Sequence, residues 1–95
     1  MPLSLNIPVL LSSPLRDYCG GASRLSVAAL SVHAALEQLE RMHPQLYGSV
    51  CDETGAVRRH VNVFVNSSNI RDLDGMATPL APGDVVTILP SVSGG

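Results

Sequence analysis

The last two residues of the sequence, Gly94 and Gly95, end a short polar tail, 90–95. Because glycine has no Cβ, a Gly-Gly segment can enter a narrow channel and adopt backbone angles that are closed to other residues. The α-carboxylate of Gly95 could then be converted to an acyl adenylate in another enzyme's active site and be attacked there by a nucleophile. Two glycines are also typical of a frayed terminus or a cloning remnant, so both interpretations stay open.

The other side chains that could ligate a metal or act in catalysis are scattered along the sequence. They are His33, His43, His60, Cys19, Cys51, Asp72 and Asp74. The cysteines lack CxxC or Cys-His spacing, which disfavours zinc, and the two carboxylates lack the 12-residue pattern of a calcium loop. We therefore expect free reduced thiols, solvated histidines and no metal site.

The composition indicates one folded domain. A chain of 95 residues leaves no room for a separate catalytic lobe, which excludes two-domain enzymes. Hydrophobic residues make up 45% and charged residues 15% of the chain. This balance is typical of a protein that folds around a core and not of a disordered chain.

The charge pattern argues against nucleic acids and membranes as partners. The net charge is −2, and all six basic residues are arginines. They are scattered except for Arg58-Arg59, so the chain lacks the row of basic residues that binds the phosphates of a nucleic acid. No apolar run approaches the roughly 20 residues that cross a bilayer. The N-terminal MPLSLNIPVLL lacks a positively charged segment and a cleavage site, so we expect a cytoplasmic protein.

The first part of the sequence predicts two strands. Apolar residues alternate with others from Leu3 to Leu11, as in a strand with one buried face. Pro8 has no N–H, so we expect it at an edge or a bulge. After a loop that contains Gly20-Gly21, residues 23–28 predict a second strand, and the two strands form a β-hairpin with a long connection.

One amphipathic helix is predicted from Val32 to His43. Ser31 is a suitable N-cap, and apolar residues recur behind it at helical spacing. Pro44 cannot continue the helix and marks its end. We expect residues 45–57 to be loop-like, with a turn or a short 3₁₀ piece.

The remaining residues predict further strands. In 59–66, three valines alternate with polar residues and one aromatic, and 69–71 is a possible short hairpin partner. The mostly apolar segment 85–89 is typical of a central strand. With one main helix to cover one face of a mixed sheet, the element order predicts an α+β roll.

Three residues are candidates for contact with partners. Phe64 alternates out of phase with the valines and should stand on the side of the sheet away from the helix. It is either part of a docking patch or packed beneath the 45–57 loop. Leu89 and Pro90 lie before the glycines, and a partner that captures Gly95 must pass over them.

A set of short segments, distributed over nearly the whole chain, matches a known family. They are Ile7-Pro8, Gly20-Gly21, His60–Asn66, Met76–Thr78, Gly83–Pro90 and the terminal Gly94-Gly95 behind Leu89-Pro90-x-Val92-x. Together they resemble the ubiquitin-like sulfur carriers, the family of MoaD, ThiS and CysO, and most of all its CysO-type members. The resemblance implies a β-grasp (ubiquitin-like) domain over 1–89 and a flexible tail over 90–95.

The resemblance further implies a carrier and not an enzyme. An E1-like enzyme of the MoeB/ThiF type would use ATP to adenylate Gly95, with Gly94 keeping the tail thin, and a sulfur donor would convert the adenylate to a thiocarboxylate. A PLP-dependent cysteine synthase or a similar synthase would accept the sulfur, and a JAMM-type metalloprotease could release the product. The carrier itself would bind no cofactor. The implied partner-binding residues are Phe64, Leu89, Pro90 and Val92.

Two alternatives stay open beside this interpretation. The chain could be a MoaD-like small subunit of molybdopterin synthase, which delivers sulfur to a pterin precursor. It could also be a ubiquitin-like modifier or a non-catalytic interaction module that shares the fold. Because the sequence contains no lysine, a modifier of this kind could not form chains through its own ε-amines.

Overall fold

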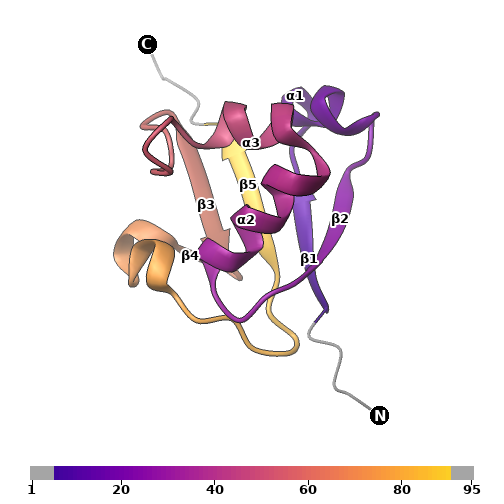
Figure 1. Cartoon of the computed structure of the whole chain (residues 1–95). Helices are drawn as coiled ribbons and strands as arrows, with labels where there is room; N and C mark the ends of the chain where they lie inside the picture. Colours follow the sequence, from indigo (N-terminus) through magenta and orange to yellow (C-terminus); the bar gives the residue numbers. More distant parts are fainter. Residues whose placement is uncertain (1–5, 91–95) are drawn as a thin grey trace.

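A five-stranded mixed sheet forms the centre of the protein (Figure 1). The computed structural model describes residues 6–90. The strands are β1 (Asn6–Leu11), β2 (Arg24–Ala28), β3 (Val61–Val65), β4 (Ser68–Asn69) and β5 (Val86–Pro90), in the order β2-β1-β5-β3-β4. β1 and β5 are parallel neighbours, whereas β2 and β3 pair antiparallel with them. The predictions of a mixed sheet, a β1–β2 hairpin and a central last strand are confirmed.

Helix α2 (Val32–Met42) packs across one face of this sheet (Figure 1). Ser31 is its N-cap, as predicted, and the Ser31 Oγ accepts a hydrogen bond from the Ala34 N–H at 3.1 Å. The core between helix and sheet is apolar. Its members include Val32, Ala35, Leu36 and Leu39 from α2 and Ile7, Val9, Leu11, Val27, Val61, Val63, Val65, Val86 and Ile88 from the strands. The architecture is the predicted α+β roll with β-grasp topology.

Residues 45–57 differ from the loop-like segment that the sequence predicts. Pro44 not only ends α2 but also begins a second helix, α3 (Pro44–Val50). A proline is tolerated at the first helical position because the N–H that it lacks would have no partner there. Leu46 and Val50, one turn apart on α3, are both buried in the core. The prediction of a loop is therefore wrong for the first half of this segment.

The predicted loop between the first two strands also contains helical turns. Helix α1 (Ser13–Arg16) and a 3₁₀ turn (Asp17–Cys19) follow β1, and the side chain of Leu15 is buried. Two more 3₁₀ turns, Ile70–Asp72 and Gly75–Ala77, occupy the segment after β4. Short turns of this kind carry little sequence periodicity, so the pattern of apolar residues does not predict them.

Several strand ends differ by one or two residues from their predicted positions, and the predicted hairpin partner 69–71 is instead β4 at Ser68–Asn69, followed by a 3₁₀ turn. β3 begins at Val61 and not at Arg59, because Arg59 and His60 form a turn. β5 extends to Pro90, one residue beyond the predicted strand, and Pro90 pairs with Val61. Pro90 therefore belongs to the sheet, whereas the sequence analysis placed it at the start of the tail.

Pro8 lies inside β1, between β2 and β5. The prediction that Pro8 lies at a sheet edge or a bulge is therefore wrong. The Leu11 N–H donates to the Ser23 carbonyl on the β2 side, and by alternation the Pro8 nitrogen faces β5. The pairing of β1 with β5 begins only at Val9. No hydrogen bond to β5 is therefore lost at the proline.

Candidate functional site

The candidate site that the sequence predicts begins where β5 ends. β5 lies between β1 and β3, and its last residue, Pro90, is paired with Val61 at the start of β3. We call the neighbourhood of this pair the tail root. The other predicted residues of the site, Val92, Gly94 and Gly95, lie outside the described residues.

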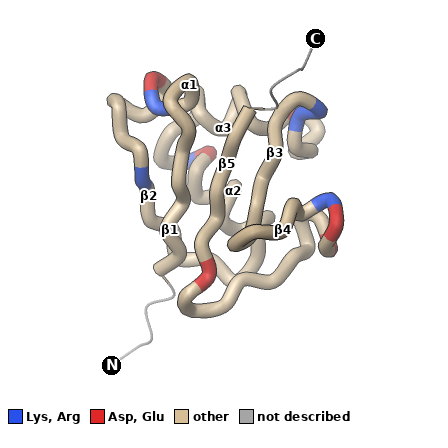
Figure 2. Tube along the Cα trace, turned by 180° about the vertical axis from the view of Figure 1, so that it is seen from behind, with Lys and Arg blue, Asp and Glu red and all other residues tan. Residues whose placement is uncertain are grey.

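The face of the sheet away from α2 is the one turned toward the viewer in Figure 2, and by the alternation along β3 and β5 it carries two of the predicted docking residues. Phe64 lies opposite Thr87, and Thr87 in turn lies opposite Leu10 of β1. Leu89 is the diagonal neighbour of Phe64, within reach of an aromatic side chain. We define Leu10, Phe64, Thr87 and Leu89 as the open-face patch. The structure thus brings Phe64 and Leu89 together on one surface.

The open-face patch is partly accessible. Leu10 is 37% and Leu89 is 36% exposed, and Phe64 is half-buried. The sequence prediction missed Leu10, although it is the one large apolar side chain among the outward-facing residues of β1 and so breaks the expected alternation. By the same alternation Pro90 turns toward the α2 side of the sheet, and it is not part of the patch.

A polar network joins the open-face patch to the tail root. Asn62, which lies opposite Leu89, accepts hydrogen bonds at its Oδ1 from the Asn69 Nδ2 at 3.2 Å and from the Arg71 Nη1 at 2.8 Å. The Arg71 Nη2 donates to the Val61 carbonyl at 2.9 Å. The Arg71 guanidinium is therefore fixed beside the residue that pairs with Pro90.

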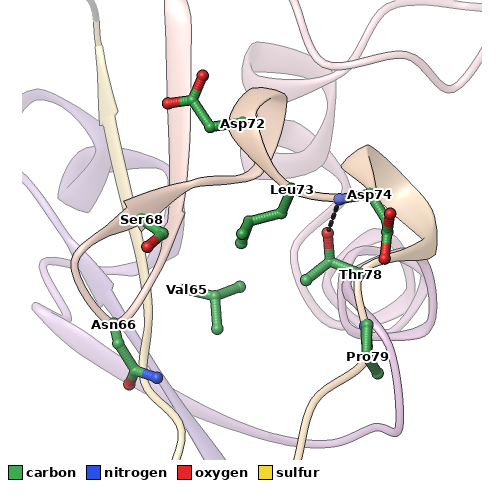
Figure 3. A pocket seen from close by; sticks show the side chains of 8 residues that line it. All are labelled: Val65, Asn66, Ser68, Asp72, Leu73, Asp74, Thr78 and Pro79. Atoms are coloured by element: carbon green, nitrogen blue, oxygen red, sulfur yellow. Dashed lines mark hydrogen bonds between the residues drawn. The ribbon is translucent and has the colours of Figure 1, made fainter.

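A pocket of about 520 Å³ lies at the other end of β3 (Figure 3). It is lined by Val65, Asn66, Ser68, Asp72, Leu73, Asp74, Thr78 and Pro79. The buried Thr78 Oγ1 accepts a hydrogen bond from the Asp74 N–H at 3.1 Å, and this bond holds the wall of the pocket. Of the predicted site residues that the structure describes, Phe64, Leu89 and Pro90, none lines it. Because Val65 ends β3 and Val61 begins it, the pocket lies away from the tail root.

Both cysteines are free, as predicted, and the structure shows that both are buried. Burial raises the pKa of the Cys51 thiol to about 11, although a hydrogen bond from the Tyr47 hydroxyl acts in the opposite direction. The Cys19 Sγ lies 3.4 to 3.9 Å from three backbone carbonyl oxygens. Neither thiol is presented to solvent as a nucleophile.

The histidines are dispersed over the fold. His33 contacts Glu37 one helical turn away, with 3.8 Å between Nδ1 and Oε1. Among residues 6–90, no three or more His, Cys, Asp and Glu side chains gather where they could hold a metal ion. Over the same residues, no helix is both long and apolar enough to span a bilayer.

Sequence comparisons connect this chain to known proteins. The ThiS family model matches residues 9–95. The sulfur carrier protein CysO of Mycobacterium tuberculosis is 34% identical over 93 residues, which cover 96% of this chain and 100% of the relative. The small archaeal modifier protein 3 of Haloferax volcanii is 42% identical over 65 residues, which cover 68% of this chain and 70% of that protein.

A solved structure has the same fold. A chain of the Amycolatopsis orientalis BexX/CysO complex has a TM-score of 0.85 and 28% identity, covering 94% of this chain and 99% of that chain. This likeness confirms the β-grasp fold. The family match over most of the chain, the identity to CysO and the shared fold together show that the chain belongs to the ThiS family of ubiquitin-like sulfur carriers.

Proposed function

We propose that this protein carries sulfur as a thiocarboxylate on Gly95. The main support is the 34% identity, over nearly the whole chain, to a protein named as a sulfur carrier. The sequence also has Gly94-Gly95 shortly after the central strand β5, where a partner's active site could receive a thin segment. The protein is then a co-substrate of other enzymes and not a catalyst.

The proposed loading reaction has two steps. An E1-like enzyme of the MoeB/ThiF type joins the Gly95 carboxylate to the α-phosphate of ATP, which forms an acyl adenylate and releases pyrophosphate. A sulfide donor then attacks the acyl carbon, and AMP leaves with the electron pair of the broken C–O bond. The product is a thiocarboxylate. ATP is bound by the activating enzyme, the carrier binds no cofactor, and we place the reaction in the cytoplasm.

The proposed acceptor is a PLP-dependent cysteine synthase or a similar synthase. A thiocarboxylate sulfur is a soft nucleophile that stays attached to the carrier until it reaches an electrophilic carbon in the acceptor enzyme. A JAMM-type metalloprotease would then cut the new product from the carrier. The BexX/CysO complex supports the idea that carriers of this fold dock on a protein partner. The open-face patch is the proposed contact, together with Pro90 and Val92.

Intact mass spectrometry tests the loading reaction. The protein is incubated with the E1-like enzyme of its source organism, ATP and sulfide. We expect a product that is heavier by the difference between a sulfur and an oxygen atom, with the change located at Gly95. An unchanged mass, obtained with an enzyme that is active on its own known carrier, would contradict the proposal.

The matched control is deletion of Gly95. This variant should show no mass shift, because its terminal carboxylate is on Gly94, one residue short of the position at which the enzyme would form the adenylate. Its circular dichroism and thermal midpoint should equal those of the wild type, because the strands and helices of residues 6–90 bury a continuous apolar core among themselves. A large loss of stability would show instead that the glycine has a structural role.

A protein modifier is the second candidate function. It is supported by the 42% identity to a small archaeal modifier protein. In that case the same activated Gly95 would form an amide with a lysine of another protein, and not a thiocarboxylate intended for a small molecule. Because Arg71 is the last trypsin site of this chain, a conjugated lysine would carry residues 72–95 after digestion. Such branched peptides, found in cells that express the wild type and missing with the Gly95 deletion, would favour the modifier over the sulfur carrier.

A further inference from the structure

Three arginines surround the tail root. Arg71 follows β4, and its Nη2 donates both to the Val61 carbonyl at 2.9 Å and to the Arg58 carbonyl at 3.1 Å. The Arg58 Nε donates to the Gly48 carbonyl at 2.9 Å. Arg59 follows directly in the turn before β3 and is exposed. We call Arg58, Arg59 and Arg71 the root arginines; Figure 2 shows basic segments beside the start of β3 and next to β4.

The charge of this cluster is not neutralised by ion pairs. Within residues 6–90 no arginine lies within 4.0 Å of a carboxylate oxygen, and the one contact of a basic side chain with a carboxylate, His33–Glu37, lies on α2. Hydrogen bonds from Thr54 and then from the Ala56 N–H lower the pKa of Asp52, and the nearby Arg58 guanidinium adds the smallest contribution. The tail root therefore carries three arginines that form no salt bridge within residues 6–90, with Asp72 directly after Arg71 in the chain and Asp52 near Arg58.

The positions of the root arginines are fixed by the backbone. Carbonyl oxygens hold parts of the Arg58 and Arg71 guanidiniums, which reduces the side-chain entropy that binding would cost. The Arg71 Nη1 also bonds to Asn62, which lies opposite Leu89 of the open-face patch. The positive cluster is thus continuous with the apolar patch.

We propose that the root arginines dock onto a cluster of carboxylates on the enzyme that activates the C-terminus. The proposal rests on the proposed function, because it places the partner beside Pro90, the last described residue before the glycines. The Arg58 Nη atoms and the Arg59 guanidinium make no hydrogen bond within residues 6–90, so each can match a carboxylate in a two-bond fork, which gives orientation as well as attraction. Arg71 contributes charge, because both hydrogens of its Nη2 are already donated to carbonyls. Charge pairs at the rim of an apolar contact mainly accelerate association and select the partner.

Arginine suits this position better than lysine for a chemical reason. A guanidinium stays protonated and is not a nucleophile at neutral pH. A lysine amine beside an activated Gly95 could attack the acyl carbon, form an amide and release AMP. The tail root therefore attracts a partner without providing an amine that would consume the activated end.

A charge reversal with a matched control tests this surface. Arg59→Glu removes a root charge that makes no hydrogen bond within the described residues, and Arg41→Glu makes the same change on α2, on the other side of the sheet. Binding of each variant to the purified E1-like enzyme is measured at low and high salt. We expect Arg59→Glu to slow association roughly tenfold at low salt, and Arg41→Glu to change it less than about twofold. The difference should shrink above about 0.1 M salt, where the Debye length falls below 10 Å.

The outcomes separate the docking surface from the sulfur chemistry. With excess enzyme, Arg59→Glu should still reach the full mass shift, because Gly95 is intact. If wild type binds the enzyme but shows no mass shift, the proposed function fails while the docking measurement stands. Equal effects of Arg59→Glu and Arg41→Glu would overturn the docking surface.

Discussion

At the residue scale, the reactive groups of this protein are divided between the interior and the C-terminus. Cys19 and Cys51 are the thiols that could compete for sulfur chemistry, and both are buried. Asp72 and Asp74 line a pocket away from the tail root, and the histidines are dispersed. The open-face patch and the root arginines provide contact surfaces and not reacting groups. The chemistry that we propose therefore depends on Gly95 alone.

The burial of the thiols predicts slow alkylation in the native protein. Because the pKa of Cys51 is raised to about 11, its thiol stays protonated at pH 8, whereas an unfolded cysteine with a pKa near 8.5 is partly thiolate. Iodoacetamide at pH 8, followed by mass spectrometry, should label neither cysteine in buffer and both in concentrated urea. Rapid labelling in buffer would show that the helical segments around these residues open readily.

At the element scale, capping and amphipathicity explain why α2 is so clear in the sequence. The apolar stripe of α2 faces the sheet, and the hydroxyl of Ser31 satisfies an N–H in its first turn. α3 is less clear because it has only seven residues, includes Gly48 and begins at a proline that is also a helix stop. Such a short helix is stabilised by burial of Leu46 and Val50 and not by its own propensity.

The cap of α2 can be tested by substitution. Ser31→Ala removes the oxygen that accepts from the Ala34 N–H, and it should lower the free energy of unfolding by about 1 kcal/mol. Ser31→Asp is the matched control, because aspartate caps as well as serine and should remain close to the wild type. Urea titrations of the three proteins provide the comparison. Equal stability of the alanine and wild-type proteins would mean that packing alone fixes the start of the helix.

At the scale of the whole molecule, hydrogen bonds join the turn after β3 to the turn before β5, at the end of the sheet opposite the tail root. We call this set of bonds, centred on Asn66 and Asp84, the clasp. The Asn66 backbone has a φ of 57°, a left-handed conformation that asparagine tolerates better than most residues. Its Nδ2 donates to the Asp84 Oδ1 at 3.1 Å, and its Oδ1 accepts from the Val85 N–H at 3.1 Å. The Asp84 carboxylate also accepts from the Ala81 N–H at 2.9 Å. Residues far apart in the sequence are thereby joined where β5 begins.

The clasp predicts a pH dependence of stability. Hydrogen bonds from the Ala81 N–H and then from the Asn66 amide hold the pKa of Asp84 below its usual value. A carboxylate whose folded pKa is depressed stabilises the fold above its unfolded pKa, near 3.9, and loses that contribution as pH falls through the folded value. Asp84→Asn should therefore melt below the wild type at pH 7, and the gap should narrow as the pH falls below about 4. A gap that is constant over this range would show that the charge of Asp84 is not involved.

The sequence by itself determined the parts of this protein that are local and periodic. Alternation predicted the strands and the outward position of Phe64, helical spacing and Ser31 predicted α2, and the spaced segments that end in Gly94-Gly95 indicated the family. These features depend on neighbours a few residues away, so the chain order contains them. The composition also shows that the chain has arginines and no lysine. An activated C-terminus, as we propose it, could therefore not form an amide with an ε-amine of another copy of this chain.

The tertiary structure decided which distant residues share a surface. Leu10, Phe64 and Leu89 come from three strands, and only the order β1-β5-β3 and its register make them neighbours. Arg71 reaches Val61 across the β3–β4 turn, so the root arginines cannot be recognised from the pair Arg58-Arg59. The physical reason is that strand register and loop closure are set by packing over the whole chain, whereas sequence spacing reports only the local repeat.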